Sequence, residues 1–576
     1  MLRWRAFWKA LGATLCLCAA LWALAPPRYE TNDDVAIRLT LEGRAVPGQP
    51  GTGFVIQSHA ALGWTLHGLA RAWPAVPWWD LVISGLLIWA IAVFSALAWD
   101  ALGRGWLARA TSVAALLVAI LPLVTTLQYT ISATLAGGVA LVVFVVELTS
   151  GARRRSVLAM AAALLAAATV LRPLAAMAGA VSGATLLLPL ALGHPAARPG
   201  RGVATLATAM AAAGGLFVVL GYADAWLYHF DRRWDEYARY NVMLARLFEW
   251  GGSVSGDRFN AMRAAAGWSE NDWEMLPAMW GVDAGVHSFD RLRRAYEVSG
   301  AAGGAPFATV AAVVERVAVL ARTQLGRVFA DAGYVLAAAA VVVAAYATRR
   351  GVATAAVLIV SFLIPCLGIE AAYKTLPFRL LAPIQACLMA AALATVASFR
   401  RPGSAVPRVL GLSLALTVLV QEATGVASAV TAGLRHMRQV EGEVAALRDL
   451  GPSLVVRHAD TFPAEIWWRP FHQPAFDFPS VALGWNNQNP MLQRFLTSTG
   501  RQPLLRAMCH DPSIVVIAAR PDRLEPVNTY MQEHFHETVA WTRLASGSFA
   551  VWRCTSDRST GDVSGTAAAT TRRDKP

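Results

Sequence analysis

Long apolar runs separated by short charged connections dominate the first 430 residues. An N-terminal run, Met1 to Pro27, has a basic start and no small-residue cleavage pattern at its end, so it predicts a retained first helix. Further runs close to the ~20 residues that cross a bilayer lie at 79–99, 111–127, 131–149, 157–171, 174–192, 203–222, 329–347, 352–368, 381–398 and 409–430. The pattern predicts a mainly α, polytopic membrane protein with about 11 transmembrane helices.

Arginine clusters fall in every second connection between these runs. They are Arg104 with Arg109, Arg153 to Arg155, Arg198 with Arg201, Arg349 with Arg350, and Arg400 and Arg401 with Arg408. Because an excess of Lys and Arg marks cytoplasmic loops, the N-terminus is predicted to be cytoplasmic. The longer, aromatic-rich loops at 26–78, 223–328 and 369–380, and the chain after 431, are then extracytoplasmic.

Strand-like runs alternate with helical stretches in the last part of the chain, for example "SLVVRH", "SIVVIAA" and "SFAVWR". This alternation predicts an extracytoplasmic α/β domain at 431–556, after a transmembrane domain at 1–430. Residues 557–576 are small and polar and are predicted to be disordered. Cys509 and Cys554 are the only cysteines of the predicted domain, and in an oxidising compartment they could form a disulfide.

Composition agrees with a membrane protein. The chain has 576 residues, of which 56% are hydrophobic and 15% charged, and its mean hydropathy is +0.45; these values exclude an ordinary soluble globular protein. The net charge of +13 comes from arginines that set topology, so it does not indicate a nucleic-acid partner. No Cys or His spacing fits a zinc site, and no metal ligands are assigned.

The adjacent carboxylates Asp33 and Asp34 follow directly on the first apolar helix. At a bilayer surface, such a pair can take a proton from a hydroxyl or hold a divalent cation while a lipid-borne substrate stays in the hydrocarbon. A structural role fits the same spacing equally well: Thr31 and Asp34 could form a capping box, and Asp34 could pair with Arg38 one turn later.

Three cations are candidate ligands of a lipid phosphate. Arg172 lies between two apolar runs, where a guanidinium is costly unless it meets an anion or water. Lys374 and Arg379 occur with Glu370 in the short loop "GIEAAYKTLPFRLLAP", a combination that suits a polyprenyl-phosphate head group. The alternatives are a snorkelling arginine and an ordinary interfacial anchor.

The large loop is rich in Trp, Asp, Glu and Asn, which together can stack on a sugar ring and bond its hydroxyls. Trp268, Asn271 and Asp272 in "GWSENDW" are the candidate sugar or acceptor ligands, with Glu370 from the shorter loop. Part of the motif has a structural explanation, because Ser269 can cap a helix with Asp272 at its third position.

Six segments follow one another along the chain in the order "TNDDVAIRLTLEG", "PWW", "GWSENDWEML", "PFRLLAP", "WWRPFHQPAF" and "GWNNQNP". By this order the chain resembles a family of bacterial membrane proteins of the GT-C glycosyltransferase superfamily. The resemblance implies a GT-C fold, an outward-facing active site, a polyprenyl-phosphate-linked sugar donor, and an acidic residue of the first outer loop as base. By that resemblance the base is Asp33 or Asp34. The loop lacks an Asp-x-Asp signature, so a divalent cation cofactor is left open.

The predicted function is transfer of one sugar from a polyprenyl-phosphate donor to an extracytoplasmic acceptor, such as lipopolysaccharide, a surface glycan or a protein, with inversion. The predicted location is the bacterial inner membrane. Asp34 is favoured over Asp33 as base because Asp33 lies closer to the helix start, where backbone N–H groups need acceptors. Two other functions remain: a flippase of lipid-linked glycans, and a non-catalytic scaffold for glycan assembly.

Overall fold

The computed structural model describes most of the chain. The described residues are 4–101, 106–149, 154–187, 199–249, 256–299, 349–373, 377–398, 405–472 and 478–557. The predicted span at 329–347 and all of the predicted disordered tail except Asp557 therefore lie outside the described residues.

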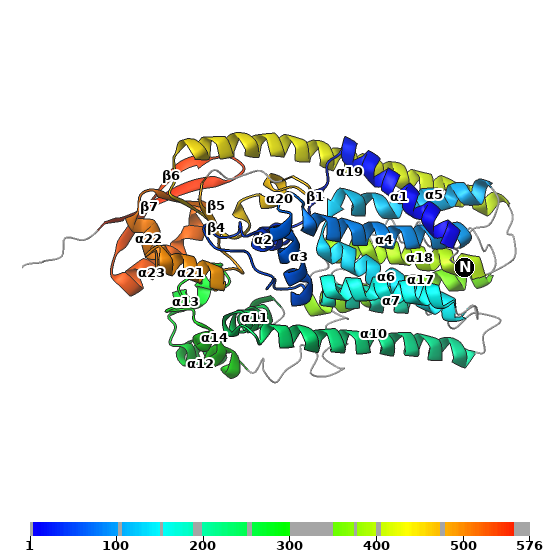
Figure 1. The fold of residues 1–576 in the computed structure, drawn as a ribbon, viewed down its shortest axis with the longest axis horizontal. Helices are drawn as coiled ribbons and strands as arrows, with labels where there is room; N and C mark the ends of the chain where they lie inside the picture. Colours follow the sequence, from blue (N-terminus) through cyan, green and yellow to red (C-terminus); the bar gives the residue numbers. More distant parts are fainter. Residues whose placement is uncertain are drawn as a thin grey trace, which may run out of the picture.

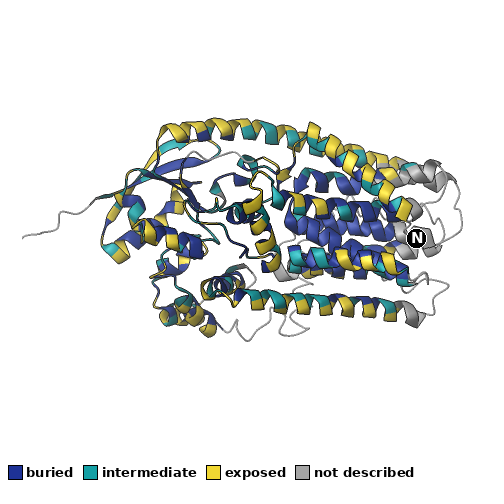
Figure 2. Ribbon diagram, viewed as in Figure 1, coloured by how far each residue is buried: buried dark blue, intermediate teal, exposed yellow. Residues whose placement is uncertain are grey.

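A bundle of long helices forms one half of the molecule (Figure 1). Its members are α1 (Trp4–Leu24), α4 (Trp78–Ala101), α5 (Trp106–Thr125), α6 (Tyr129–Thr149), α7 (Arg155–Leu171), α8 (Pro173–Leu186), α10 (Pro199–Tyr228), α17 (Arg349–Tyr373), α18 (Phe378–Ser398) and α19 (Ala405–Asp449). α6 packs against α4, α7, α8 and α18 and is buried along most of its length, whereas α10 and α19 keep exposed outer faces (Figure 2).

Glycines allow α6 and α8 to pack closely. A Cβ atom at Gly179 would lie 1.9 Å from the carbonyl oxygen of Thr134, and one at Gly137 would lie 2.4 Å from that of Ala176. In a membrane, where lipid chains are as apolar as leucine, such close backbone contact is a main source of helix association.

Four helices among the described residues are long and apolar enough to cross a membrane: Trp4–Leu24, Trp78–Leu97, Tyr129–Leu148 and Val203–Tyr228. The last one exposes apolar side chains such as Val218 and Val219, which are 57% and 64% exposed, as expected for a lipid-facing helix. Several other described apolar helices are shorter, so the predicted total of about eleven spans stays a prediction.

The connections predicted to lie outside the membrane gather at one end of the bundle, opposite the N-terminus (Figure 1). They contain α2 (Asn32–Glu42), α3 (Ala60–Ala72), α11 (Arg232–Leu244), a π-helix (Ala245–Glu249), α12 (Asp257–Ala266), α13 (Glu270–Met275) and α14 (Phe289–Val298). The side of the membrane that this end faces stays a prediction from the arginine pattern.

The C-terminal part forms a five-stranded sheet with helices around it, which confirms a small domain containing a sheet. The strands are β3 (Leu454–Arg457), β4 (Ser480–Ala482), β5 (Ile514–Ala518), β6 (Thr538–Ser546) and β7 (Ala550–Asp557), in the order β4-β3-β5-β7-β6. β4, β3 and β5 are parallel, and β7 and β6 are antiparallel. Its helices are α20 (Ala464–Trp467), α21 (Pro490–Ser498), α22 (Leu504–His510) and α23 (Glu525–Phe535).

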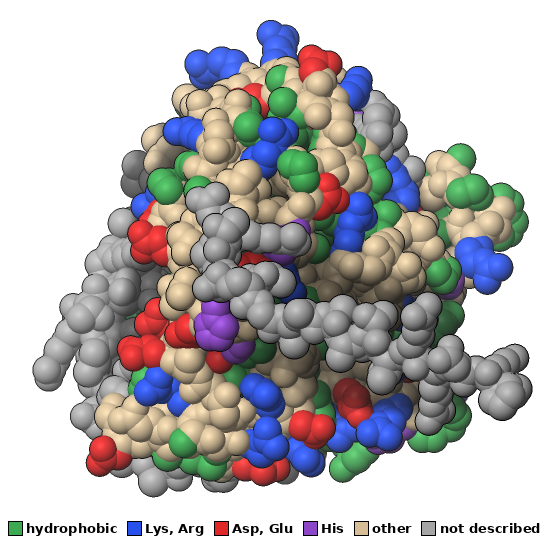
Figure 3. All heavy atoms as spheres, turned by 90° about the vertical axis from the view of Figure 1, so that its left-hand side faces the viewer, with side chains coloured by type: hydrophobic (Ala, Val, Ile, Leu, Met, Phe, Trp, Pro, Cys, Tyr) green, Lys and Arg blue, Asp and Glu red, His purple; other side chains and the backbone are tan. Residues whose placement is uncertain are grey.

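Two further features characterise this domain. Cys509 and Cys554 form a disulfide with their Cα atoms 4.4 Å apart, which confirms the predicted bridge. α19 runs without interruption across the predicted boundary at 431, so the domain is joined to the bundle by a continuous helix. Charged side chains of both signs are scattered over this end of the molecule, as on a water-facing surface (Figure 3).

Candidate active site

Asp34 lies in the first turn of α2 and is completely buried. Its Oδ1 accepts hydrogen bonds from the Trp79 indole N–H and the Tyr129 backbone N–H, both at 3.2 Å. Its Oδ2 has no hydrogen-bond partner among the described residues. Burial, reinforced by the nearby charge of Asp33, raises the pKa of Asp34 well above its ordinary value. The carboxylate is thus fixed by one oxygen and unsatisfied at the other.

The capping explanation of the acidic pair is wrong for this structure. Thr31 is the N-cap residue of α2, but its side chain makes no capping hydrogen bond. Arg38 pairs with Glu42 and Asp80 rather than with Asp34. Asp34 therefore takes part in neither the capping box nor the ion pair that its spacing predicts.

A short β pairing places α2 against the bundle. β1 (Arg28–Tyr29) pairs in parallel with β2 (Thr126–Leu127), so the segment before α2 is held beside the start of α6. This pairing brings Asp34 to the backbone N–H of Tyr129, 95 positions later in the chain.

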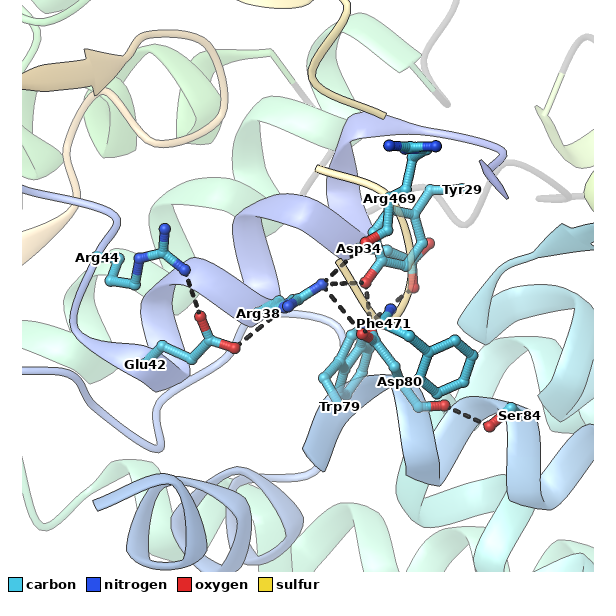
Figure 4. A network of polar contacts seen from close by, with 10 residues as sticks. All are labelled: Tyr29, Asp34, Arg38, Glu42, Arg44, Trp79, Asp80, Ser84, Arg469 and Phe471. Carbon is cyan, nitrogen blue, oxygen red and sulfur yellow. Dashed lines mark hydrogen bonds and ion pairs between the residues drawn. The ribbon is translucent and has the colours of Figure 1, made fainter. Parts of the chain in front are cut away.

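Beneath α2 lies a buried polar network that the sequence analysis did not identify (Figure 4). The Arg38 guanidinium is 3.0 Å from Asp80, whose side chain is fully buried. The Tyr29 hydroxyl donates to the other oxygen of Asp80. The signal was present: Asp80 is an acid at the start of an apolar spanning run, where a charged group is costly unless it is partnered.

The C-terminal domain contributes two backbone groups to this network. The Phe471 N–H donates to Asp80 at 2.7 Å, and the Arg469 carbonyl accepts from Arg38 at 3.2 Å. Phe471 has a φ of 61°, a left-handed conformation that is unfavourable for a bulky residue. Because Trp79 and Asp80 are adjacent, one helix end binds both the Asp34 carboxylate and the C-terminal domain.

Arg172 and Arg379 lie near the acidic pair. Arg172, between α7 and α8, donates to the Gln57 side chain and stands over the Tyr129 ring, with its guanidinium carbon 4.9 Å from the ring centroid. The Tyr129 side chain interacts electrostatically with Arg172, Arg379, Asp33 and Asp34 together. The structure therefore gathers two of the three predicted phosphate ligands with both predicted bases.

Arg379 lies in the first turn of α18 and approaches Glu30 at 3.8 Å. Burial raises the pKa of Glu30, and the positive charge of Arg379 opposes that shift. Lys374 lies outside the described residues. Glu370 lies in α17, but its side chain is also outside the described part of the chain.

The predicted sugar ligands of the large loop lie elsewhere. Trp268 is buried and donates to the carbonyl of Val286, and the Asn271 amide donates to the carbonyl of Pro526 in α23. Asp272 forms the predicted capping box with Ser269. These side chains join the large loop to the C-terminal domain and are not brought together with Asp34.

The same junction holds the one candidate cluster of metal ligands found among the described residues. Ligand atoms of Asp272, Glu533 and His534 lie within 4.8 Å of one another. They are already connected by other contacts, since His534 is 2.8 Å from Asp272 and Glu533 accepts from the Ser269 hydroxyl. The cluster thus has a structural role in linking α13 to α23.

No family model and no curated protein matches the chain. Among solved structures, the fold is similar to a crystal structure of ArnT from Cupriavidus metallidurans in the apo state. The sequences are 14% identical, the match covers 94% of this chain and 97% of that one, and the TM-score is 0.35. A structure of the same protein bound to undecaprenyl phosphate matches over the same shares of the two chains, with 13% identity and a TM-score of 0.32.

Proposed function

We propose that the chain is an integral-membrane glycosyltransferase of the GT-C type. It transfers one sugar from a polyprenyl-phosphate donor to an extracytoplasmic acceptor, such as lipopolysaccharide, a surface glycan or a protein. The observation that carries the proposal is Asp34, a buried carboxylate held at Oδ1 by two donors and left without a partner at Oδ2 among the described residues. A carboxylate oxygen with no protein partner can accept the proton of a hydroxyl that is placed beside it.

Asp34 is the proposed general base. Its Oδ2 takes the proton of the acceptor hydroxyl while the hydroxyl oxygen bonds to the anomeric carbon. The bond from that carbon to the phosphate oxygen breaks, its electron pair leaves with the lipid phosphate, and the configuration inverts. Burial raises the pKa of Asp34, so its carboxylate binds a proton more readily than an exposed aspartate does, as a general base requires.

Asp33 is the second candidate for the base. It is half-buried rather than enclosed, and adjacent helical positions point about 100° apart, so the two carboxylates face different surroundings. Asp34 is closed off from solvent in this structure, and the acceptor reaches it only when a neighbouring side chain moves.

Arg172 and Arg379 are the proposed ligands of the leaving phosphate, with Lys374 as a third. They supply positive charge where negative charge develops during the reaction, and loss of one such group typically lowers the rate ~10²–10³-fold. Arg172 is well oriented for this task because Gln57 and the Tyr129 ring hold it. Gln57 has a φ of 83°, a strained backbone conformation of the kind often found at functional sites. Nothing in this mechanism requires a divalent cation.

The position of the charged residues favours transfer over transport. A transporter places its substrate site near the middle of the membrane, between repeats. The acidic pair and Arg172 lie where the helices meet the connecting loops, at the end of the bundle that carries the C-terminal domain (Figure 1). A non-catalytic scaffold for glycan assembly would keep its function when both aspartates are replaced, whereas a glycosyltransferase would lose its activity.

The test is to replace Asp34 and Asp33 singly by Asn, which keeps the size of the side chain and removes its charge. Transfer should collapse for at least one variant while protein level holds. Asp290→Asn is the matched control, because Asp290 is 74% exposed on α14. Mass spectrometry of surface glycans from a deletion strain carrying each variant measures the product. If both variants modify the acceptor as the wild type does, the assignment of the base is wrong.

A further inference from the structure

The side chains that the sequence suggested as sugar ligands are not near the acidic pair. Trp268, Asn271 and Asp272 instead join the large loop to itself and to the C-terminal domain. In a single displacement, the sugar lies between the leaving phosphate and the base that activates the acceptor. A residue that binds the sugar should therefore be held beside both Arg172 and Asp34.

Gln57 meets this requirement, because it is hydrogen-bonded to Arg172 and to the residue that holds Asp34. Its Oε1 accepts one hydrogen bond from the Arg172 guanidinium and another from the Tyr129 hydroxyl. Tyr129 continues the connection, since its backbone N–H donates to Asp34 and its ring lies against the Arg172 guanidinium. Gln57 is thus linked directly to the proposed phosphate ligand and, through Tyr129, to the proposed base.

The orientation of the Gln57 amide follows from these partners. A guanidinium donates hydrogen bonds and accepts none, so the amide atom that faces Arg172 must be the oxygen. The amide nitrogen then lies on the other side of the group, and within the described part of the chain nothing accepts a hydrogen bond from it. Because Gln57 is exposed, its two N–H groups are available to a ligand.

The backbone around Gln57 holds the side chain in a fixed place. The N–H of His59 donates to the carbonyl of Val170 at 3.0 Å, which ties this connection to the end of α7. The N–H of Ala60 donates to Asp224 of α10 at 2.7 Å. Gln57 itself has a left-handed φ of 83°, which glycine or asparagine would adopt more easily. Strain of this kind is retained where the side chain has a task.

We propose that Gln57 binds the transferred sugar, with its amide N–H donating to a sugar oxygen beside the anomeric carbon. This assignment rests on the proposed transferase function. A neutral amide suits a neutral hydroxyl or ring oxygen, whereas the charged guanidinium of Arg172 suits the phosphate. The sugar that fits presents a hydrogen-bond acceptor to Gln57 while the lipid phosphate lies at Arg172.

Two variants of Gln57 test the contact. Gln57→Gly removes the amide and relaxes the left-handed backbone, so the fold should hold. Gln57→Asn keeps an amide and tolerates the same φ, but withdraws the N–H groups by one carbon. Gln49→Gly is the matched control, because it makes the same change in the same connection, at a residue held through its backbone N–H. Arg172→Gln removes the charge proposed to bind the phosphate.

Native mass spectrometry of the full chain compares two probes. One is undecaprenyl phosphate, and the other is the polyprenyl-phosphate sugar extracted from membranes of a deletion strain, where nothing consumes it. The ratio of the two affinities isolates the sugar, since an effect that acts through Arg172 changes both affinities alike. We expect Gln57→Gly and Gln57→Asn to lower this ratio roughly three- to tenfold, the value of one neutral hydrogen bond. Gln49→Gly and Arg172→Gln should leave the ratio unchanged.

An unchanged ratio in Gln57→Gly, with weaker binding of both probes, would reduce Gln57 to a support for Arg172 and overturn the assignment to the sugar. Equal affinities of the wild-type protein for the two probes would also overturn it, because the sugar would then make no favourable contact. The transferase proposal fails on a different observation: a deletion strain that accumulates no polyprenyl-phosphate sugar would refute it, and the role of Gln57 with it.

Discussion

The pair formed by Arg38 and Asp80 allows a quantitative prediction. Their side chains are 1% and 0% exposed, and the two charged groups are 3.0 Å apart. Removal of one partner of a buried pair typically costs about 3–5 kcal/mol, because an uncompensated charge stays buried. Asp80 keeps two donors, the Tyr29 hydroxyl and the Phe471 N–H, so we expect Arg38→Met to fall at the lower end, about 3 kcal/mol.

A double-mutant cycle isolates the contribution of the pair. Asp80→Asn removes the other charge, and the double variant Arg38→Met/Asp80→Asn should be less destabilised than the sum of the single variants by about 1–3 kcal/mol. Reversible unfolding of the purified protein in mixed micelles measures each free energy. Arg232→Met, which breaks an exposed pair with Glu236, is the control and should have no measurable effect. Additive effects in the cycle would refute the coupling inferred from the geometry.

Three further predictions concern the C-terminal domain. Replacement of Cys509 and Cys554 by Ala should destabilise the domain by about 4 kcal/mol, which is the loop-closure value for their separation of 45 residues. Limited proteolysis of the oxidised and the reduced protein is the assay, and equal cleavage of the two would contradict this prediction. Burial raises the pKa of Glu537, but hydrogen bonds from His510 and Arg506 outweigh it and lower that pKa from 4.5 to about 2. Stability from Glu537 should therefore be complete above about pH 4.5 and be lost as the pH falls toward about 2, and Glu537→Gln should remove this slope from acid unfolding curves. A phosphatase fused to the C-terminus should be active outside the cytoplasm, and activity confined to the cytoplasm would reverse the predicted orientation.

The sequence located the acidic pair but not the residues that hold it. Asp33 and Asp34 could be found because they follow an apolar helix directly, and this feature can be read from the order of residues along the chain. Trp79 and Asp80 meet α2 only after folding, and their contacts with Asp34 and Arg38 join segments about 45 positions apart. Local spacing suggested Asp34 as the partner of Arg38, but a fully buried acid of another helix binds that guanidinium instead.

Composition was a weaker guide to binding in the large loop. Trp268, Asn271 and Asp272 were selected because aromatic and carboxylate side chains suit a sugar. In the structure Trp268 makes a buried hydrogen bond within the loop, and Asn271 and Asp272 make partly buried hydrogen bonds to groups of the C-terminal domain. A residue's type does not reveal whether it packs against another domain or faces a ligand, since both roles use the same hydrogen-bonding groups.

The C-terminal domain is therefore part of the site rather than an attached module. The N–H of Phe471 and the carbonyl of Arg469 bind the same buried charges that anchor the start of α4, and the residue next to Asp80 is the tryptophan that holds Asp34. A movement of the segment around Phe471 would leave Asp80 short of a donor and Arg38 short of an acceptor, and that cost favours the closed arrangement.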